Sequence, residues 1–150
     1  MKILIIGASG ATGKQLVHQL IHMGYMVKII VRSSVKLPTH WMDNENIIII
    51  KGNISEISVQ EMAKHIRDCQ AVVSCLGHNI TLKGIYGNPR KLVTDAVRLT
   101  CTAIKRNAFE KPVKFVLMNT TGNRNKDLDE RISFRERLVV GLIRMLVPPH

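Results

Sequence analysis

The stretch Lys2-Ile3-Leu4-Ile5-Ile6-Gly7-Ala8-Ser9-Gly10-Ala11-Thr12-Gly13 decides the fold of this chain. Its first half is a continuous apolar run, which is typical of a strand buried on both faces of a parallel sheet. The run stops at a turn with the pattern G-x-x-G-x-x-G, and helix-like sequence follows at once. We therefore predict a strand, a tight glycine turn and a helix in direct succession.

The glycine turn has the composition of a diphosphate-binding loop. Gly7 would permit the tight turn, Gly10 would let a diphosphate approach the backbone, and Gly13 would let the helix lie close to the strand. Free N–H groups at the positive end of the helix dipole would hold the anion. The residues expected to bind the cofactor here are Gly7, Ser9, Gly10, Ala11, Thr12 and Gly13. A turn that binds nothing is the alternative, and the apolar strand about twenty residues further on favours binding.

Apolar runs alternate with helical patterns along the rest of the chain. The expected strands are 2–6, 26–31, 47–51, 71–75 and 113–118, and the expected helices are about 12–24, 58–67, 88–107 and 128–146. This alternation predicts an α/β fold: a doubly wound parallel sheet of strand order 3-2-1-4-5 with helices on both faces. A ligand would lie at the carboxyl ends of the strands, between the first and the fourth. The length of 150 residues predicts one domain, 1–150.

Composition narrows the function classes. The net charge of +11 would attract anions in general, but aromatic residues make up only 4% of the chain, which argues against a nucleic-acid stacking surface. No apolar run is long enough for a membrane span, and the N-terminus makes a poor signal peptide. The three cysteines lack metal-binding spacing, so we expect reduced thiols, no metal site and a cytoplasmic location.

Two residue types carry further expectations. The methionines are expected to fill the core, namely Met23, Met26, Met42, Met62, Met118 and Met145. Trp41 lies in a segment with Pro, His and Asp, and is expected in a loop that could lie near an adenine ring.

Four segments together resemble the atypical short-chain dehydrogenase/reductase superfamily. They are the Gly7–Gly13 turn, Val31-Arg32, Gly52-Asn53 and Ser74-Cys75-Leu76-Gly77, and the resemblance covers essentially all 150 residues. The branch it resembles is the NAD(P)H-binding group that includes flavin/biliverdin reductase-like and NmrA-like proteins. The resemblance implies a Rossmann-like domain and an NAD(P)H-dependent oxidoreductase whose small-molecule acceptor is ring-shaped, such as a flavin or a quinone.

The chain departs from that superfamily in two respects. The usual Tyr-x-x-x-Lys dyad is missing, because neither Tyr25 nor Tyr86 is followed by Lys four residues on. Flavin reductase-like members work without the dyad, whereas NmrA-type regulators bind NADP without catalysis, so a redox sensor is the alternative function. Full-length relatives also continue past the last helix, so we expect a truncated or unusually short protein. That helix, 128–146, is where many relatives dimerise, and it would otherwise cover the sheet.

The end of the second strand predicts which dinucleotide is preferred. An acidic residue there would bind the ribose 2′-hydroxyl of NAD, whereas an arginine accommodates the 2′-phosphate of NADP. The chain has Arg32 with no acid nearby, so we predict that NADP(H) is preferred over NAD(H). The alternative is that Arg32 is only a solvated residue at a strand end.

The resemblance implies further site residues at the ends of later strands. Asn53 stands where relatives often carry an Asp that bonds the adenine amino group, and Leu76 and Gly77 would pass under the adenine-ribose side. His78 would lie near the nicotinamide as a proton donor, and Thr120 stands at about the position of the family's Ser. A plain loop residue at His78 and an ordinary turn hydroxyl at Thr120 are the alternatives.

Overall fold

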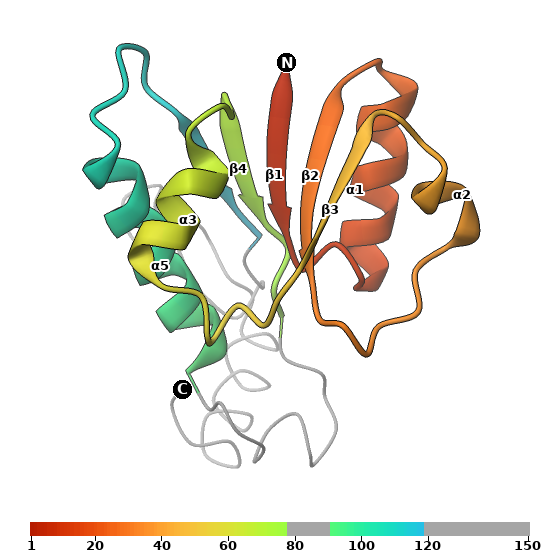
Figure 1. The fold of residues 1–150 in the computed structure, drawn as a ribbon, viewed down its shortest axis with the longest axis horizontal. Coiled ribbons are helices and arrows are strands. Elements are labelled where there is room, and N and C mark those ends of the chain that lie inside the picture. The colour runs from red at the N-terminus through yellow and green to blue at the C-terminus, as the bar shows by residue number, and fades with distance from the viewer. Residues whose placement is uncertain (78–90, 119–150) are drawn as a thin grey trace, which may run out of the picture. The chain divides into compact units, whose positions relative to one another are not determined.

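Five strands form one parallel sheet in the computed structural model, which describes residues 1–77 and 91–118. The strands are β1 (Lys2–Ile6), β2 (Met26–Val31), β3 (Ile47–Lys51), β4 (Ala71–Ser74) and β5 (Lys114–Leu117). Their order is β3-β2-β1-β4-β5, and every neighbouring pair is parallel (Figure 1). The Rossmann-like sheet and strand order predicted from the sequence are confirmed.

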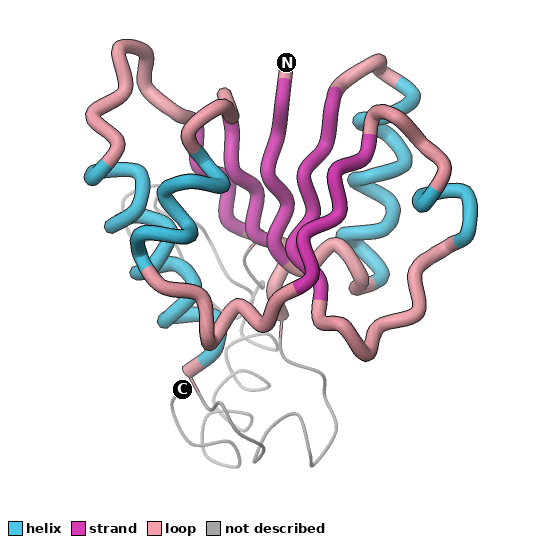
Figure 2. Tube along the Cα trace, viewed as in Figure 1, coloured by secondary structure: helices cyan, strands magenta, loops and turns pink. Residues whose placement is uncertain are grey.

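Helices cover both faces of this sheet. They are α1 (Ala11–His22), α2 (Thr39–Met42), α3 (Val59–Ile66) and α5 (Leu92–Arg106). Figure 2 shows α1 and α2 on one side of the strands and α3 and α5 on the other. None of the helices in the described ranges is long and apolar enough to cross a membrane. The single domain predicted for 1–150 stays a prediction, since it extends beyond the described residues.

The alternation of side chains along β1 explains why its sequence is apolar throughout. Ile3 and Ile5 pack in the core on the α1 side, whereas Leu4 and Ile6 pack in the core on the side of α3 and α5. All four side chains are buried. A central strand with helices on both faces offers no position to a polar residue.

Local signals explain where the helices begin and end. Helix α1 starts at Ala11, slightly before the predicted start, and after its last turn Gly24 adopts a φ of +77°. Glycine adopts this left-handed conformation without strain, so it ends the helix. Ser58 and Glu61 form a capping box that starts α3. The predicted start of α5 near residue 88 lies outside the described residues.

Two expectations about single residues are wrong. Trp41 lies in the short helix α2 and is 2% exposed in the core on the α1 side, so it cannot stack on an adenine from a loop. Met23, Met26 and Met42 are exposed, and each lies at an end of an element: just after α1, at the start of β2 and at the end of α2. Met62, in the middle of α3, is fully buried as expected.

Candidate functional site

The glycine turn follows β1 and is closed by a hydrogen bond from the Gly10 N–H to the Gly7 carbonyl at 3.1 Å. Gly7 has a φ of +83°, and a Cβ there would lie 2.8 Å from the carbonyl carbon of Cys75. The turn therefore requires a left-handed residue without a side chain at this position. The same close approach brings the end of β4 against the turn.

Gly13 and Gly10 differ in what surrounds them. A Cβ at Gly13 would lie 2.2 Å from the Gly7 carbonyl oxygen and 2.8 Å from the Cα of Ala8, so the first turn of α1 rests directly on the loop. Gly10 is exposed, and a Cβ there would meet only the Gly7 oxygen at 3.4 Å. The packing roles predicted for Gly7 and Gly13 are confirmed, and the outer side of Gly10 is open.

The first turn of α1 presents unpaired donors beside this open side. The Lys14 N–H bonds the Gly10 carbonyl at 2.9 Å, and no side chain caps the helix. Within the described part of the chain, the N–H groups of Ala11, Thr12 and Gly13 have no acceptor. No acidic residue lies in this turn, so the positive end of a 12-residue helix is left free for an anion. An open glycine and three free donors fit a diphosphate.

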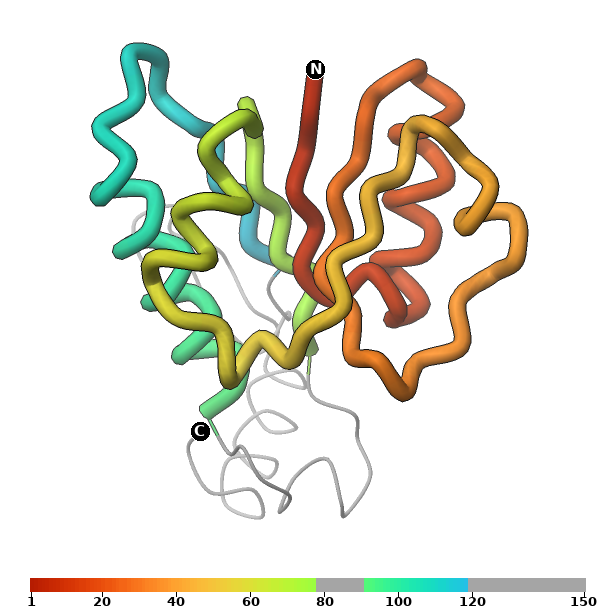
Figure 3. The backbone as a smooth tube through the Cα atoms, in the orientation of Figure 1, coloured from red at the N-terminus to blue at the C-terminus, as the bar shows by residue number. Residues whose placement is uncertain are grey.

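The ends of β2 and β3 lie at the same edge of the sheet as the glycine turn (Figure 3). Arg32 directly follows β2, is exposed, and makes no ion pair with any acid in the described ranges. Asn53 follows β3, and its Nδ2 donates to Oε1 of Glu56 at 2.9 Å. Its Oδ1 accepts only a long bond of 3.4 Å from the Ser55 N–H. This oxygen therefore keeps most of its capacity to accept another hydrogen bond.

The end of β4 completes the described part of this edge. The Cys75 backbone contacts Gly7, Leu76 is half-buried against the α3 side, and Gly77 is exposed. The Cys75 side chain is buried, and this burial raises the pKa of its thiol. Leu76 therefore lies next to the glycine turn, and the contact of Leu76 and Gly77 with the adenine-ribose side stays a prediction.

The residues predicted to bind the cofactor lie at the edge of the sheet where its strands end. His78 and Thr120 lie outside the described residues, and so does the segment 128–146. Tyr25 directly precedes β2 and packs half-buried on the α1 side, at the opposite edge of the sheet from the glycine turn. Sequence reasoning missed Glu56, which the Asn-x-x-Glu spacing after β3 could have indicated.

Comparisons with known proteins agree with this geometry. The model of a protein family described as NAD(P)H-binding matches residues 7–138. An uncharacterised chloroplast protein of Arabidopsis thaliana is 34% identical over 74 residues, which is 49% of this chain and 26% of that protein. The chain thus spans about a quarter of the length of this relative.

Solved structures show the same fold at low sequence identity. An oxidoreductase of Lactococcus lactis has a TM-score of 0.62 at 18% identity, over 97% of this chain and 63% of its own. A short-chain dehydrogenase/reductase of Veillonella parvula in complex with NADP has a TM-score of 0.60 at 14% identity, over 81% of this chain and 48% of its own. The enzyme WbmH of Bordetella bronchiseptica in complex with NAD+ has a TM-score of 0.55 at 23% identity, over 71% of this chain and 35% of its own. These likenesses show an α/β fold shared with short-chain dehydrogenases.

Proposed function

Because the chain belongs to the NAD(P)H-binding family whose model matches residues 7–138, we propose that it is an NAD(P)H-dependent oxidoreductase of the atypical short-chain dehydrogenase/reductase type. Its acceptor would be a small ring-shaped molecule such as a flavin or a quinone. The observation that carries this proposal is the start of α1, where three N–H groups with no acceptor in the ranges 1–77 and 91–118 lie beside the open side of Gly10.

Different residues at the carboxyl ends of the strands would each bind a different part of the cofactor. The N–H groups of Ala11, Thr12 and Gly13 would hold the diphosphate, with the hydroxyls of Ser9 and Thr12 beside them. Asn53 Oδ1 would accept a bond from the adenine amino group, since its Nδ2 is already engaged with Glu56. Leu76 and Gly77 would support the adenine-ribose side. The bound nicotinamide supplies the hydride.

Two residues outside the described ranges complete the proposal. His78 would donate a proton to the reduced acceptor, and the Thr120 hydroxyl would orient the acceptor. A cytoplasmic location and a homodimer through residues 128–146 also belong to the proposal.

We further propose that the protein prefers NADP(H) to NAD(H). Arg32 is the first residue after β2, is exposed, and has no acidic partner in the described part of the chain. A guanidinium can donate two parallel hydrogen bonds to a phosphate. Arg32 would therefore bind the 2′-phosphate, which only NADP carries.

A second candidate function is an NADP-binding redox sensor that does not catalyse. It is favoured by the position of Tyr25, which lies at the edge of the sheet away from the glycine turn and is not followed by Lys four residues on. Steady consumption of NADPH with FMN or a quinone would support the enzyme. Saturable NADPH binding without turnover of any such acceptor would support the sensor.

Calorimetric titration of the full chain with NADPH and NADH at fixed salt tests the binding proposal. We expect Arg32→Gln to weaken NADPH binding about tenfold and to leave NADH binding unchanged, since one charge-assisted contact is worth about 1.5 kcal/mol. Arg98→Gln is the matched control, because Arg98 is also exposed but lies on α5, away from the glycine turn. An unchanged NADPH/NADH affinity ratio in Arg32→Gln would refute the assignment of Arg32, and absence of binding of either dinucleotide to the unaltered chain would refute the function.

A further inference from the structure

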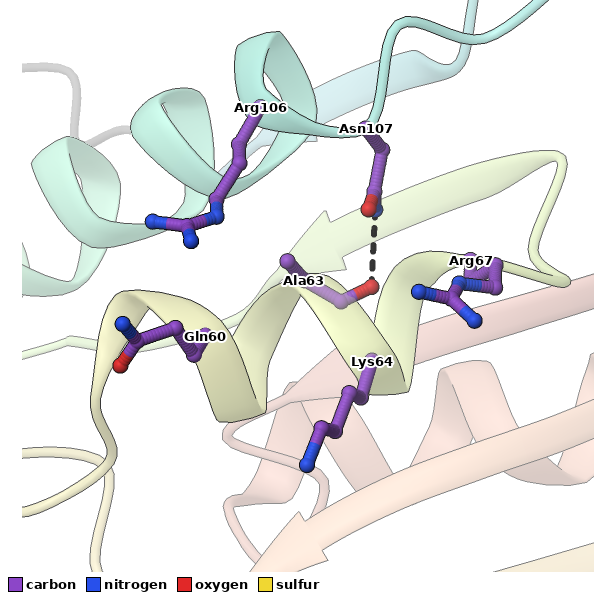
Figure 4. Close-up of a pocket in the computed structure, with 6 residues that line it drawn as sticks. All are labelled: Gln60, Ala63, Lys64, Arg67, Arg106 and Asn107. Atoms are coloured by element: carbon purple, nitrogen blue, oxygen red, sulfur yellow. Dashed lines mark hydrogen bonds between the residues drawn. The ribbon is translucent and has the colours of Figure 1, made fainter.

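A cleft with a basic lining lies between α3 and α5. This cleft of about 220 Å³ is lined by Gln60, Ala63, Lys64, Arg67, Arg106 and Asn107 (Figure 4). It lies on the face of the sheet that α3 and α5 cover, whereas the glycine turn leads into α1 on the other face. The cleft is therefore separate from the candidate dinucleotide site.

The walls of the cleft are held together by packing and by one hydrogen bond. Ala63 and Ala103 are buried between the two helices, and their small side chains let the helices approach closely. The Asn107 Nδ2, at the end of α5, donates to the Ala63 carbonyl of α3 at 2.8 Å. This bond joins segments 44 residues apart in the sequence and fixes the distance between the walls.

The acids nearest to the cleft in the sequence are engaged elsewhere. Glu61 turns back to Ser58, whose hydroxyl and backbone N–H donate to its Oε2 at 2.7 and 2.9 Å. Asp68, which follows Arg67, binds the ammonium groups of Lys2 and Lys28. Neither carboxylate forms an ion pair with Lys64, Arg67 or Arg106.

The three cations of the cleft have no directly bonded acid among the residues that the structure describes. Lys64, Arg67 and Arg106 make no ion pair with any acid in the ranges 1–77 and 91–118. Basic residues at the C-terminal end of a helix ordinarily offset its negative end, and all three cations lie there: Lys64 and Arg67 at the end of α3, and Arg106 at the end of α5. The packing of α3 against α5 brings the three cations to one cleft, where like charges raise each other's energy.

The size and borders of the cleft indicate what would fill it. At about 220 Å³ it is smaller than the pockets of roughly 300 Å³ and more that take drug-sized molecules. None of the large apolar side chains exposed in the described residues lines it, so a protein partner would find no hydrophobic anchor there. A small ionic ligand fits these observations better than a protein surface.

We propose that this cleft binds a small oligophosphate. In Figure 4, Arg106 reaches from α5 toward α3, Arg67 lies on the other side of the bond between Asn107 and Ala63, and Lys64 extends from α3 away from α5. The charges are spread along the cleft and do not meet at one point. This spread suits a short chain of phosphates better than a single phosphate, and arginine is the residue that pairs with phosphate oxygens in a fixed geometry. The inference does not rest on the proposed function.

Titration of the ¹⁵N-labelled full chain with inorganic tripolyphosphate, followed by amide NMR shifts, tests this site. We expect saturable shifts at Gln60, Lys64 and Asn107 that are distinct from shifts at the glycine turn, which also binds anions. Orthophosphate should bind more weakly than tripolyphosphate at the same ionic strength. ATP in place of tripolyphosphate distinguishes a nucleotide ligand from a free oligophosphate, because only a nucleotide ligand gains affinity from the base.

Substitutions on the two helices provide the controls. Arg67→Gln and Arg106→Gln should each weaken binding about two- to fivefold, the effect of one exposed ion pair, and both together about tenfold. Arg98→Gln removes the same charge from α5 outside the cleft and should change little. Shifts confined to the glycine turn, shifts equal to those caused by chloride at the same ionic strength, or equal losses in Arg98→Gln and Arg106→Gln would each overturn the proposal.

Discussion

Replacing the glycines of the turn one at a time should separate the folding role of each from its binding role. Gly13→Ala is the decisive change, because its Cβ would lie 2.2 Å from the Gly7 carbonyl oxygen, where ordinary contacts start near 3.4 Å. The neighbouring atoms belong to the backbone of Gly7 and Ala8, which cannot rotate away. Overpacking costs about 1–3 kcal/mol, and more where backbone must move. We therefore expect Gly13→Ala to lower the free energy of unfolding by about 3 kcal/mol or more.

Three other glycines provide graded controls. Gly24 has a φ of +77° and no atom within 4 Å of its would-be Cβ, so Gly24→Ala carries only the left-handed penalty of about 1–2 kcal/mol. Gly7→Ala adds to that penalty a contact of 2.8 Å with Cys75. Gly10 has an ordinary extended conformation and meets only one atom at 3.4 Å, so Gly10→Ala should cost less than about 1 kcal/mol.

Urea unfolding, followed by circular dichroism and with constant m-values, measures this order. The expected order of destabilisation is Gly10→Ala, then Gly24→Ala, then Gly7→Ala and Gly13→Ala. In calorimetry, Gly10→Ala should still lose most of its NADPH affinity, because its methyl group would stand on the open side where the diphosphate approaches. The reasoning is refuted if Gly13→Ala is no less stable than Gly24→Ala, or if Gly10→Ala binds NADPH as the unaltered chain does.

Three further predictions concern the described core and its edge. Burial tends to raise the pKa of Asp68, but hydrogen bonds from Lys2 and Lys28 outweigh it and bring this pKa to about 2. The ionised form therefore stabilises the fold above pH 4 by about 1 kcal/mol after screening at this half-exposed site, and this contribution is lost as the pH falls toward 2. Asp68→Asn should remove this dependence of the free energy of unfolding on pH, measured by urea unfolding. The same pH dependence in Asp68→Asn and in the unaltered chain would contradict the pairing. Ser74 has a buried hydroxyl with no hydrogen-bond partner in the described residues, so Ser74→Ala should leave stability unchanged or raise it by up to about 1 kcal/mol, and a clear loss would mean that the hydroxyl has a partner. Trp41→Ala should cost about 3–5 kcal/mol in the same assay, as expected for a core aromatic, and a stable variant that binds NADPH poorly would instead place Trp41 in the site.

The sheet could be predicted closely because its strands are buried on both faces. The bounds of β1, β2 and β3 agree with the predicted ranges, since each is an apolar run bounded by turn residues. Parallel pairing then follows from the helices between the strands. Only the ends of the later strands differ, where β4 and β5 are shorter than predicted.

The surroundings of single side chains could not be predicted in the same way. Helix α2 is a single turn of four residues, too short to show a helical period, so nothing in the sequence indicated that Trp41 would enter the core. Met26 and Met62 are the same residue type, yet one is exposed at the start of β2 and the other is buried in α3. Burial depends on the position within the element, which composition does not report.

The two candidate sites differ in how far they could be predicted from the sequence, because one is formed by neighbouring residues and the other by residues far apart in the chain. The glycine turn is local, because the left-handed Gly7 and the unpaired N–H groups arise within residues 7–13, so the sequence contains its whole signature. The basic cleft arises from a contact between Ala63 and Asn107, and Asp68, next to its Arg67, bonds Lys2 across 66 residues of sequence. Neither relation is visible before the chain has folded.

A preference between NAD and NADP can arise only at the 2′-phosphate, whereas the rest of the cofactor is the same in both and contributes to binding alone. The glycine turn would contact the diphosphate that NAD and NADP share, and solved structures of this fold contain either cofactor. Under our proposal Arg32 would attract the 2′-phosphate of NADP, and so would the net charge of +11; these two causes respond differently to salt. At 1 M salt the Debye length falls to about 3 Å, so attraction by distant charges is lost, whereas a direct contact is only weakened. If Arg32 carries the preference, the NADPH/NADH affinity ratio stays above one at high salt in the unaltered chain and in Arg98→Gln, but not in Arg32→Gln. If the ratio falls to one in all three proteins, the preference comes from net charge, and Arg32 is only a solvated strand end.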